Sequence, residues 1–218
     1  MSLRINDIAP DFTAESTEGT IRFHEWIGDS YAIIFSHPRD FTPVCTTEFG
    51  AVAQLAPEFE ARNTKVLGVS VDSVDDHRKW KADIAKVAGV PANFAIIDDR
   101  DLTVAKAYDM LPAEYYLPTE GRTPADSATV RTVFIIGPDK KVRLTMTYPM
   151  SVGRNFAEIL RALDAVRRTD GVPLATPANW VPGQDVIVAL SLDDRAAEEK
   201  FGPLDIKLPY LRYAKDPA

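Results

Sequence analysis

The strongest constraint on the fold of this 218-residue chain is the order of its segments, in which strand-like and helix-like stretches alternate. Short apolar runs of strand length occur at Ile33–Ser36, Val66–Val71 and Phe94–Ile97. Between them, residues 43–62 carry apolar residues every three to four positions, as on one face of an amphipathic helix. Residues 75–88 predict a second helix, which begins with acidic residues and ends at Gly89. Strands and helices that alternate in this way predict a layered α/β domain.

The following segments predict a hairpin and further helices. Thr129–Ile136 and Lys141–Tyr148 flank the turn sequence Gly-Pro-Asp-Lys and so predict two antiparallel strands. Helices are expected at Leu102–Tyr108 and Asn155–Arg168, and the Pro-, Thr- and Glu-rich stretch Leu111–Ser127 is expected to be an exposed loop. The complete order predicts an α/β sandwich with a mixed central sheet.

The composition changes after Thr169. Recurrent prolines, among them Pro173, Pro182 and Pro209, preclude long helices in this part of the chain. We therefore predict two domains, residues 1–168 and residues 169–218, the second a small loop-rich extension with one short helix near Asp193–Phe201.

The charge and the apolar runs limit the partners of the chain. A formal charge of −7 argues against nucleic acid or an anionic membrane, which bind clustered Lys and Arg. The longest apolar runs have the length of strands and are too short to span a bilayer. The first residues lack the basic and then apolar pattern of a secretion signal, so we expect a cytoplasmic protein.

Cys45 is the only cysteine in the chain. This excludes an intramolecular disulfide and any zinc site built from several thiolates. A single cysteine is most often a small buried hydrophobic residue, so a chemical role has to be argued from its neighbours. If it does react, the second thiol of any redox cycle has to come from another molecule.

The residues before Cys45 predict the start of a helix. Pro43 suits the first helical position, which makes Thr42 the N-cap and puts Cys45 in the first turn. Unpaired N–H groups and the helix dipole stabilise a thiolate there and lower the thiol pKa from its free value of about 8.5. The Thr42 hydroxyl can accept a hydrogen bond from a helix N–H while its proton points at the sulfur or at a bound oxygen.

Residues 38–48 resemble the active-site segment of the peroxiredoxins, with Pro38, Thr42 and Cys45 in the pattern Pro-x-x-x-Thr-x-x-Cys. The single cysteine and the C-terminal extension resemble the one-cysteine, peroxiredoxin-6-like subfamily. Further matches cover nearly the whole chain: Ala9-Pro10-Asp11-Phe12, Ser70-Val71-Asp72-Ser73, Gly137-Pro138-Asp139-Lys140-Lys141 and Gly153-Arg154-Asn155-Phe156. The resemblance implies a thioredoxin-like fold and a thiol-dependent peroxidase that needs no cofactor.

The resemblance also implies the roles of several residues. Arg131 matches an arginine at the start of a later strand that reaches the thiolate. Its guanidinium and the Thr42 hydroxyl would stabilise charge on the departing peroxide oxygen. Pro38 and Val44 are expected to contact the peroxide together with Arg131, while Cys45 attacks it.

Three residues near these motifs have more than one interpretation. Glu48, one turn after the cysteine, either orients Arg131 or is an ordinary surface residue. His37 lines the pocket, contacts another subunit or is a structural histidine. Arg154 opens a helix and either acts near the active site or forms a salt bridge. His77 is expected on a solvated surface, and three scattered histidines without ligand spacing predict no bound metal.

The implied reaction oxidises Cys45 to a sulfenic acid, which an external thiol then reduces by way of a mixed disulfide. Glutathione, a glutaredoxin or a thioredoxin-like protein could serve, and excess peroxide would produce the inactive sulfinic acid. The resemblance implies a homodimer or a higher homo-oligomer, with the C-terminal extension of one subunit near the active site of another.

Two other functions compete with the peroxidase. One is a redox sensor or oligomeric holdase that passes oxidation to a partner. The other is a minor phospholipase activity, which some relatives have through a Gly-x-Ser-x-Gly segment, a His and an Asp. The matching residues are Ser30, His24 and Asp139, but Ala32 replaces the last glycine and Ser30 precedes a strand instead of following one.

Overall fold

The computed structural model describes residues 3–116 and 127–217. The chain divides into two compact units, Met1–Phe156 and Ala157–Ala218. The sequence predicted this division at the end of helix α5 (Phe156–Thr169), whereas the units divide at its beginning. The reason is that Ala165 of α5 packs against the core of the second unit, so the helix belongs with the C-terminal part.

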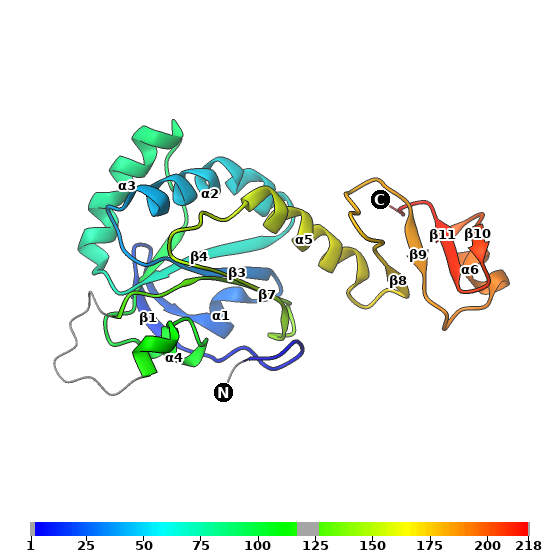
Figure 1. Cartoon of the computed structure of the whole chain (residues 1–218), viewed down its shortest axis with the longest axis horizontal. Coiled ribbons are helices and arrows are strands. Elements are labelled where there is room, and N and C mark those ends of the chain that lie inside the picture. The colour runs from blue at the N-terminus through cyan, green and yellow to red at the C-terminus, as the bar shows by residue number, and fades with distance from the viewer. Residues whose placement is uncertain (1–2, 117–126, 218) are drawn as a thin grey trace. The chain divides into compact units, whose positions relative to one another are not determined.

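The first unit contains a seven-stranded sheet in the order β2-β1-β5-β4-β3-β6-β7 (Figure 1). Strands β3 (Tyr31–Ser36), β4 (Thr64–Ser70) and β5 (Ala95–Asp98) are parallel to one another. Strand β6 (Arg131–Ile136) is antiparallel to β3, and β7 (Val142–Tyr148) is antiparallel to β6. The mixed sheet predicted from the sequence is confirmed.

The N-terminal edge of this sheet was not predicted. It consists of the hairpin β1 (Thr13–Ser16) and β2 (Gly19–Arg22), with β1 antiparallel to β5. Helix α1 (Phe23–Ile27) follows directly. Strands of four residues are too short for a clear period of two, so the sequence gives little signal for them.

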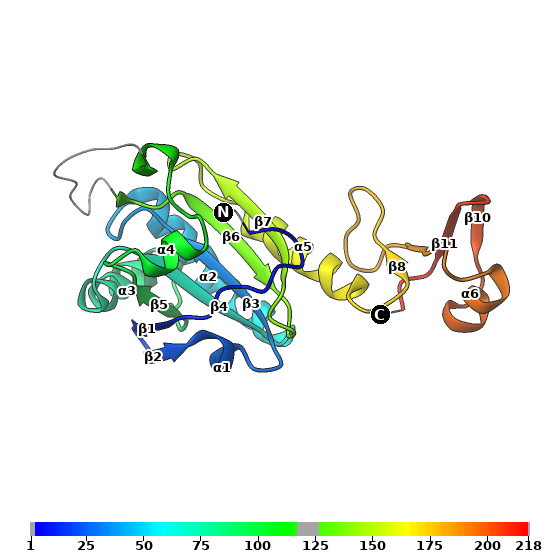
Figure 2. The same cartoon turned by 90° about the horizontal axis from the view of Figure 1, so that it is seen from below.

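Helices cover both faces of the sheet. Helices α2 (Pro43–Ala61) and α3 (Val74–Ala88) lie on one face, and α1 and α4 (Thr103–Ala107) lie on the other (Figures 1 and 2). A 3₁₀ turn, η1 (Ala113–Tyr116), begins the segment predicted as a loop; residues 117–126 of that loop lie outside the described part of the chain. Among the helices of the described residues, none has the length and apolar character needed to cross a bilayer.

The strands send alternate side chains into two layers of core. Ala32 and Ile34 of β3 belong to the apolar cluster on the side of α1 and α4. Phe35 points to the opposite face, where its ring centroid lies 4.8 Å from that of Phe49 of α2. This alternation is the period of two expected for a strand covered on both faces. It brings α2, and with it Cys45, close to the carboxyl end of β3.

The second unit contains a four-stranded antiparallel sheet in the order β10-β11-β9-β8. Its strands are β8 (Leu174–Ala175), β9 (Val186–Val188), β10 (Asp205–Leu208) and β11 (Leu211–Ala214). The short helix predicted near the end of the chain is confirmed as α6 (Asp194–Phe201). The sheet was missed, because strands of two to four residues between prolines resemble loops in sequence.

Gly68 in β4 has to be a glycine because Phe49 of α2 lies directly on it. A Cβ atom at position 68 would come within 2.9 Å of the Phe49 ring. Replacing Gly68 with alanine should therefore lower the free energy of unfolding by about 1–3 kcal/mol, the usual cost of overpacking a core. Urea unfolding followed by circular dichroism measures the change.

Gly50 in α2 provides the control, since a Cβ there would meet Ala88 at an ordinary 3.5 Å. Gly50→Ala should be neutral or stabilise the protein by up to about 1 kcal/mol, because alanine favours the helix. Equal losses in both variants would contradict the assignment of the close contact to Gly68.

Candidate active site

Cys45 lies in the first turn of α2, where the sequence predicted it. Pro43 is the first helical residue, and Thr42 before it has the extended backbone of an N-cap (φ −111°, ψ 148°). The cysteine side chain is fully buried, with an exposed fraction of 0%. The helix start therefore presents its free N–H groups in a site that excludes solvent.

The Thr42 hydroxyl is oriented differently from the prediction. It makes no capping hydrogen bond, and instead donates its proton to the carbonyl oxygen of Arg39 at 2.9 Å. The predicted arrangement, with the hydroxyl proton pointing at the sulfur, is therefore wrong. The Thr42 oxygen keeps lone pairs that can accept a hydrogen bond from the O–H group of a hydroperoxide.

Arg131 reaches the thiol from the first position of β6. Its Nη1 lies 3.3 Å from Cys45 Sγ and 2.7 Å from Oε2 of Glu48. Its Nε donates to the carbonyl oxygen of Met150 at 2.7 Å. A carboxylate and a carbonyl thus fix the guanidinium plane, and a donor N–H stabilises negative charge on the sulfur.

Glu48 is buried and forms ion pairs with two arginines, so its interpretation as a surface residue is excluded. Its Oε1 accepts from the backbone N–H (2.8 Å) and from Nε (2.9 Å) of Arg154, and its Oε2 accepts from Nη2 (2.7 Å). Arg154 Nη1 also donates to the carbonyl oxygens of Ser36 and Thr132. Arg154 lies just before helix α5, which begins at Phe156, and the Glu48 carboxylate compensates its charge there.

The charges of this cluster balance when the thiol is ionised. Burial alone would raise the pKa of Glu48, but hydrogen bonds and charge from Arg154, together with the charge of Arg131, lower it overall. Glu48 is therefore an anion beside two guanidinium groups. A Cys45 thiolate supplies the second negative charge, so the buried cluster becomes neutral.

His37 and His77 meet at a carboxylate, which the sequence did not indicate. Asp40 Oδ1 lies 2.7 Å from His37 Nε2, and Asp40 Oδ2 lies 2.6 Å from His77 Nδ1. Both histidines are fully buried, so the prediction of His77 as a solvated surface residue is wrong. Burial lowers the pKa of His37 despite its bond to Asp40, and its Nδ1 has no hydrogen-bond partner.

The three side chains offer ligand atoms within 4.8 Å of one another, which is close enough to consider a metal ion. Two ligands of a tetrahedral zinc are about 3.3 Å apart, given metal–ligand bonds of about 2.0–2.1 Å. The observed contacts of 2.6 and 2.7 Å are those of shared protons. Burial alone would raise the pKa of Asp40, yet bonds from both histidines lower it, which fits a carboxylate that accepts two N–H groups.

The residues predicted to contact the peroxide lie around the thiol segment. Pro38 and Val44 are half-buried, and a Cβ on Gly153 would meet Val44 at 3.5 Å. Phe41 was not predicted; it is 53% exposed and has a left-handed backbone conformation with φ of 55°. The contact of Pro38 and Val44 with substrate stays a prediction.

The residues of the proposed lipase triad do not meet. Ser30 Oγ donates to Oδ1 of Asn63 at 3.0 Å, and Asp139 pairs with Arg143 at 2.9 Å. His24 Nε2 contacts a backbone carbonyl oxygen at 2.8 Å. Since each has a different partner, the structure does not support a hydrolase site at Ser30.

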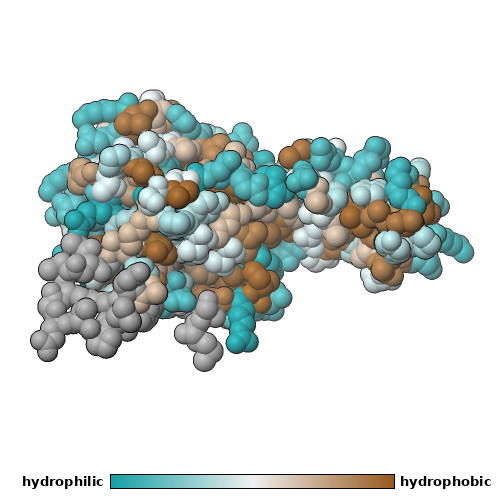
Figure 3. Space-filling model, viewed as in Figure 1, coloured by the Kyte–Doolittle hydropathy of each residue, from teal (hydrophilic) through white to brown (hydrophobic). Residues whose placement is uncertain are grey.

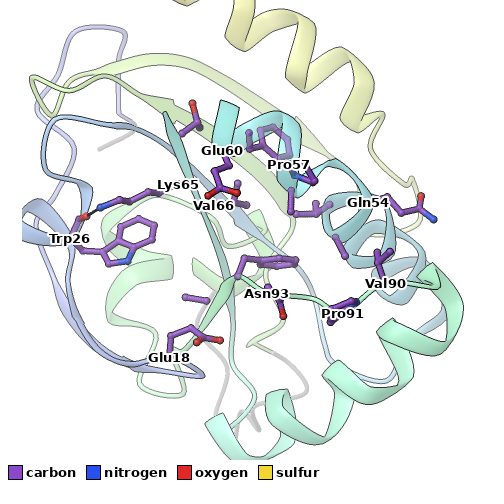
Figure 4. Close-up of a pocket in the computed structure, with 17 residues that line it drawn as sticks. Glu18, Trp26, Gln54, Pro57, Glu60, Lys65, Val66, Val90, Pro91 and Asn93 are labelled. Carbon is purple, nitrogen blue, oxygen red and sulfur yellow. Dashed lines mark hydrogen bonds between the residues drawn. The ribbon is translucent and has the colours of Figure 1, made fainter. Parts of the chain in front are cut away.

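A pocket of about 630 Å³ lies away from the thiol (Figure 4). Its walls are mainly apolar residues of α2 and β4 and the segment leading into β5, while Glu18, Trp26 and Lys65 stand at one side. Cys45 and Arg131 are not among the lining residues. The pocket therefore takes no part in the thiol chemistry.

The site consists of a buried thiol at a helix start beside a fixed guanidinium, on a mixed sheet covered by helices. These features define a thiol-dependent enzyme of thioredoxin-like architecture. Residues 5–145 match the AhpC/TSA family, and residues 165–202 match the C-terminal domain of 1-Cys peroxiredoxin. The chain therefore belongs to the AhpC/TSA family and is a peroxiredoxin, a thiol peroxidase, of the one-cysteine type.

Individual relatives agree over the full length. The chain is 48% identical to the mitochondrial peroxiredoxin PRX1 of Saccharomyces cerevisiae, over 98% of this chain and 81% of that protein. It is 46% identical to peroxiredoxin-6 of Rattus norvegicus, over 99% of this chain and 98% of that protein.

Solved structures agree equally well. A yeast mitochondrial 1-Cys peroxiredoxin superposes with a TM-score of 0.88 at 47% identity, covering 98% of this chain and 99% of that one. A cysteine-to-serine mutant of peroxiredoxin 6 from Arenicola marina gives 0.90 at 39% identity, covering 99% of both chains. The fold and family predicted from the sequence are confirmed.

The Glu48 ion pairs predict a stability change. Glu48→Gln should lower the free energy of unfolding at pH 7 by about 3–5 kcal/mol, because two buried guanidinium groups lose their anion. The lowered pKa of Glu48 means that its contribution is present above the ordinary value of 4.5 and is lost as the pH falls below it. The two proteins should therefore differ less at acidic pH, as measured by urea unfolding.

Glu58→Gln is the matched control, since Glu58 lies on the same helix with a side chain that is 56% exposed. It should change stability by less than about 1 kcal/mol. A loss at Glu48 no larger than at Glu58 would contradict the central place of the Glu48 carboxylate.

Proposed function

We propose that Cys45 is the nucleophile of the peroxidase and that Arg131 and Thr42 stabilise its transition state. The observation that carries this proposal is the 3.3 Å contact between Arg131 Nη1 and Cys45 Sγ inside a buried site. The low dielectric of such a site strengthens the attraction between the guanidinium and the negative charge that moves from sulfur to oxygen.

In the proposed reaction, the thiolate attacks one peroxide oxygen. The S–O bond forms as the O–O bond breaks, and the departing oxygen takes the electron pair. The proton of the attacked oxygen moves to the departing oxygen, so water or an alcohol leaves and Cys45 becomes a sulfenate, the conjugate base of the sulfenic acid. Thr42, whose own proton is donated to the carbonyl oxygen of Arg39, accepts a hydrogen bond from the hydroperoxide O–H and orients the substrate. Arg131 donates to the oxygens that carry the developing charge.

Glu48 and Arg154 act as positioning residues. The bidentate contact of Arg154 with Glu48 fixes the carboxylate, which in turn fixes Arg131 against the sulfur. Pro38 and Val44 would contact the organic part of the substrate, and His37 would support the same segment through Asp40. No metal or cofactor enters the proposed cycle.

The cycle closes with an external thiol. One thiol attacks the sulfenic sulfur and releases water, and a second attacks the mixed disulfide and returns the Cys45 thiolate. We propose glutathione, a glutaredoxin or a thioredoxin-like protein as the reductant. The solved yeast 1-Cys peroxiredoxin supports this choice, since its thiol is resolved by glutathione and thioredoxin systems.

The mechanism predicts that replacing Cys45 abolishes oxidation of the protein by peroxide. After rapid mixing with hydrogen peroxide, the wild-type protein should gain one oxygen by mass spectrometry, with a parallel change in tryptophan fluorescence. Cys45→Ser should show neither change. A Cys45→Ser variant that consumes peroxide at the wild-type rate would contradict the assignment of the nucleophile.

Three further variants separate the roles of Arg131 and Thr42 within this experiment. Arg131→Met should slow the oxidation of Cys45 by about 100- to 1000-fold, as expected when one charge-stabilising donor is removed. Thr42→Ser should retain most of the rate and Thr42→Val should lose it, because only serine keeps the hydroxyl.

If oxidised Cys45 were reduced by no added thiol, the redox-sensor or holdase function would be favoured.

We propose that the protein forms a homodimer or a larger homo-oligomer, with the extension of residues 169–218 taking part. In support, β7 is an edge strand that carries the half-buried apolar side chains of Leu144 and Met146. Leu190, Ile206 and Leu208 of the second unit are exposed, and Figure 3 shows apolar side chains on its surface. Light scattering that gives only the monomer mass at micromolar concentration would count against this proposal.

We propose a cytoplasmic location. The yeast relative is mitochondrial, so this proposal assigns the two proteins to different compartments. Fractionation of cells that produce the protein from its own gene distinguishes the two compartments.

A further inference from the structure

The complete burial of Cys45 restricts which molecules can reach it. Its exposed fraction is 0%, and it lies in the first turn of a helix. A hydroperoxide is small, but a thiol that forms a mixed disulfide has to bring its own sulfur within bonding distance of Sγ. The proposed cycle therefore needs the segment around Cys45 to open before the reductant reacts.

Two side chains of α3 hold this segment on either side of the cysteine. His77 Nδ1 contacts Asp40 Oδ2 at 2.6 Å, and Trp80 Nε1 donates to Thr46 Oγ1 at 3.1 Å. His77 and Trp80 are three positions apart and so share one face of the helix. Asp40 precedes Cys45 in the chain and Thr46 follows it, so the two contacts bracket the thiol.

The contact between His77 and Asp40 is the stronger of the two. His77 Nε2 contacts the carbonyl oxygen of Ile97 at 3.0 Å, which fixes the plane of the ring. The contacts from both histidines lower the pKa of Asp40, so the carboxylate is an anion. The His77 contact is therefore a short, buried hydrogen bond to a charged oxygen, whereas Trp80 bonds a neutral hydroxyl.

The backbone of the segment makes one hydrogen bond to a side chain outside it, from Asp40 N–H to Asp72 Oδ2 at 2.9 Å. The N–H groups of the first turn have no partner within the helix, and the first helical bond runs from Thr46 N–H to the carbonyl oxygen of Thr42 at 3.0 Å. Phe41 has a left-handed conformation with φ of 55°, which is strained for a bulky residue. This strain favours opening, so the side-chain contacts have to oppose it.

We propose that His77 and Trp80 form a clasp, named here the α3 clasp, which holds residues 40–46 closed over Cys45 and limits the access of an external thiol. Both are positioning residues, since neither contacts the sulfur. The inference rests on the proposed function in one respect only: it takes the reductant to be an external thiol.

The test uses two substitutions of one histidine. His77→Gln places an amide where Nε2 lies, which keeps the bond to Ile97 and removes the bond to Asp40. His77→Asn places an amide where Nδ1 lies, which keeps a donor to Asp40. His77→Gln should raise the rate of Cys45 alkylation by a maleimide at least tenfold, whereas His77→Asn should stay within about threefold of the wild-type rate.

Trp80→Phe offers an independent variant that removes the indole N–H and keeps a smaller aromatic ring in the core. It should raise the alkylation rate by a smaller factor than His77→Gln. Lys79→Gln, whose side chain is 71% exposed on the same helix, is the control and should leave the rate unchanged. Unchanged labelling in both His77→Gln and Trp80→Phe would overturn the clasp.

Hydrogen exchange distinguishes local opening from general destabilisation. The clasp predicts faster exchange of the amides of residues 40–46 in His77→Gln, with the amides of β3 and β4 unchanged. Equal acceleration throughout the first unit would overturn the proposal, since His77 would then be a general core residue. Glutathione should also reduce pre-oxidised His77→Gln several-fold faster than wild type.

These measurements separate the clasp from the peroxidase mechanism. Alkylation and hydrogen exchange use the reduced protein without peroxide, so they report on the clasp even if Cys45→Ser contradicted the proposed nucleophile. Faster alkylation without faster reduction by glutathione would overturn the claim that the clasp limits the access of the reductant.

Discussion

The arrangement of the active site depends on the carboxylate of Glu48. It binds two guanidinium groups that come from distant parts of the chain, Arg131 on β6 and Arg154 before α5. Both arginines are buried, and each would carry an unpaired charge without this anion. The carboxylate therefore joins helix α2 to strand β6 and to the segment before α5 and, in the same geometry, holds a cation against Cys45.

Local sequence signals predicted one part of this site and tertiary burial decided the rest. Pro43 and Thr42 mark a helix start, so the place of Cys45 in the first turn followed from chain chemistry alone. Arg131 was predicted only from a family resemblance, because nothing local indicates that a strand residue reaches a thiol. For Glu48, a helix position allowed both a surface and a buried role, and only the packing of Arg154 decides between them.

The error on His77 has a physical explanation that is visible in the sequence. Helix α3 is rich in charge, which favoured a solvated histidine, yet His77, Trp80 and Ile84 follow the three-to-four spacing of a buried face and are all buried. The polar partner that makes burial tolerable, Asp40, is 37 positions away in the chain. Spacing could have indicated the face, but no local pattern indicates such a partner. The strands of the second unit were missed for a simpler reason, since they are too short to show a period.

The burial that encloses the contact between Arg131 and Cys45 also separates the two halves of the proposed cycle. A dry, closed site strengthens the contact between Arg131 and the sulfur, and the peroxide step benefits from it. A chain with one cysteine has no resolving thiol of its own, so the same closure keeps out the molecule that must complete the cycle. A closed state for oxidation and an open state for reduction satisfy both requirements, provided that they differ little in free energy. The strained backbone of Phe41 and the polar contacts of α3 act in opposite directions on this difference, which is why a segment of seven residues can adjust it.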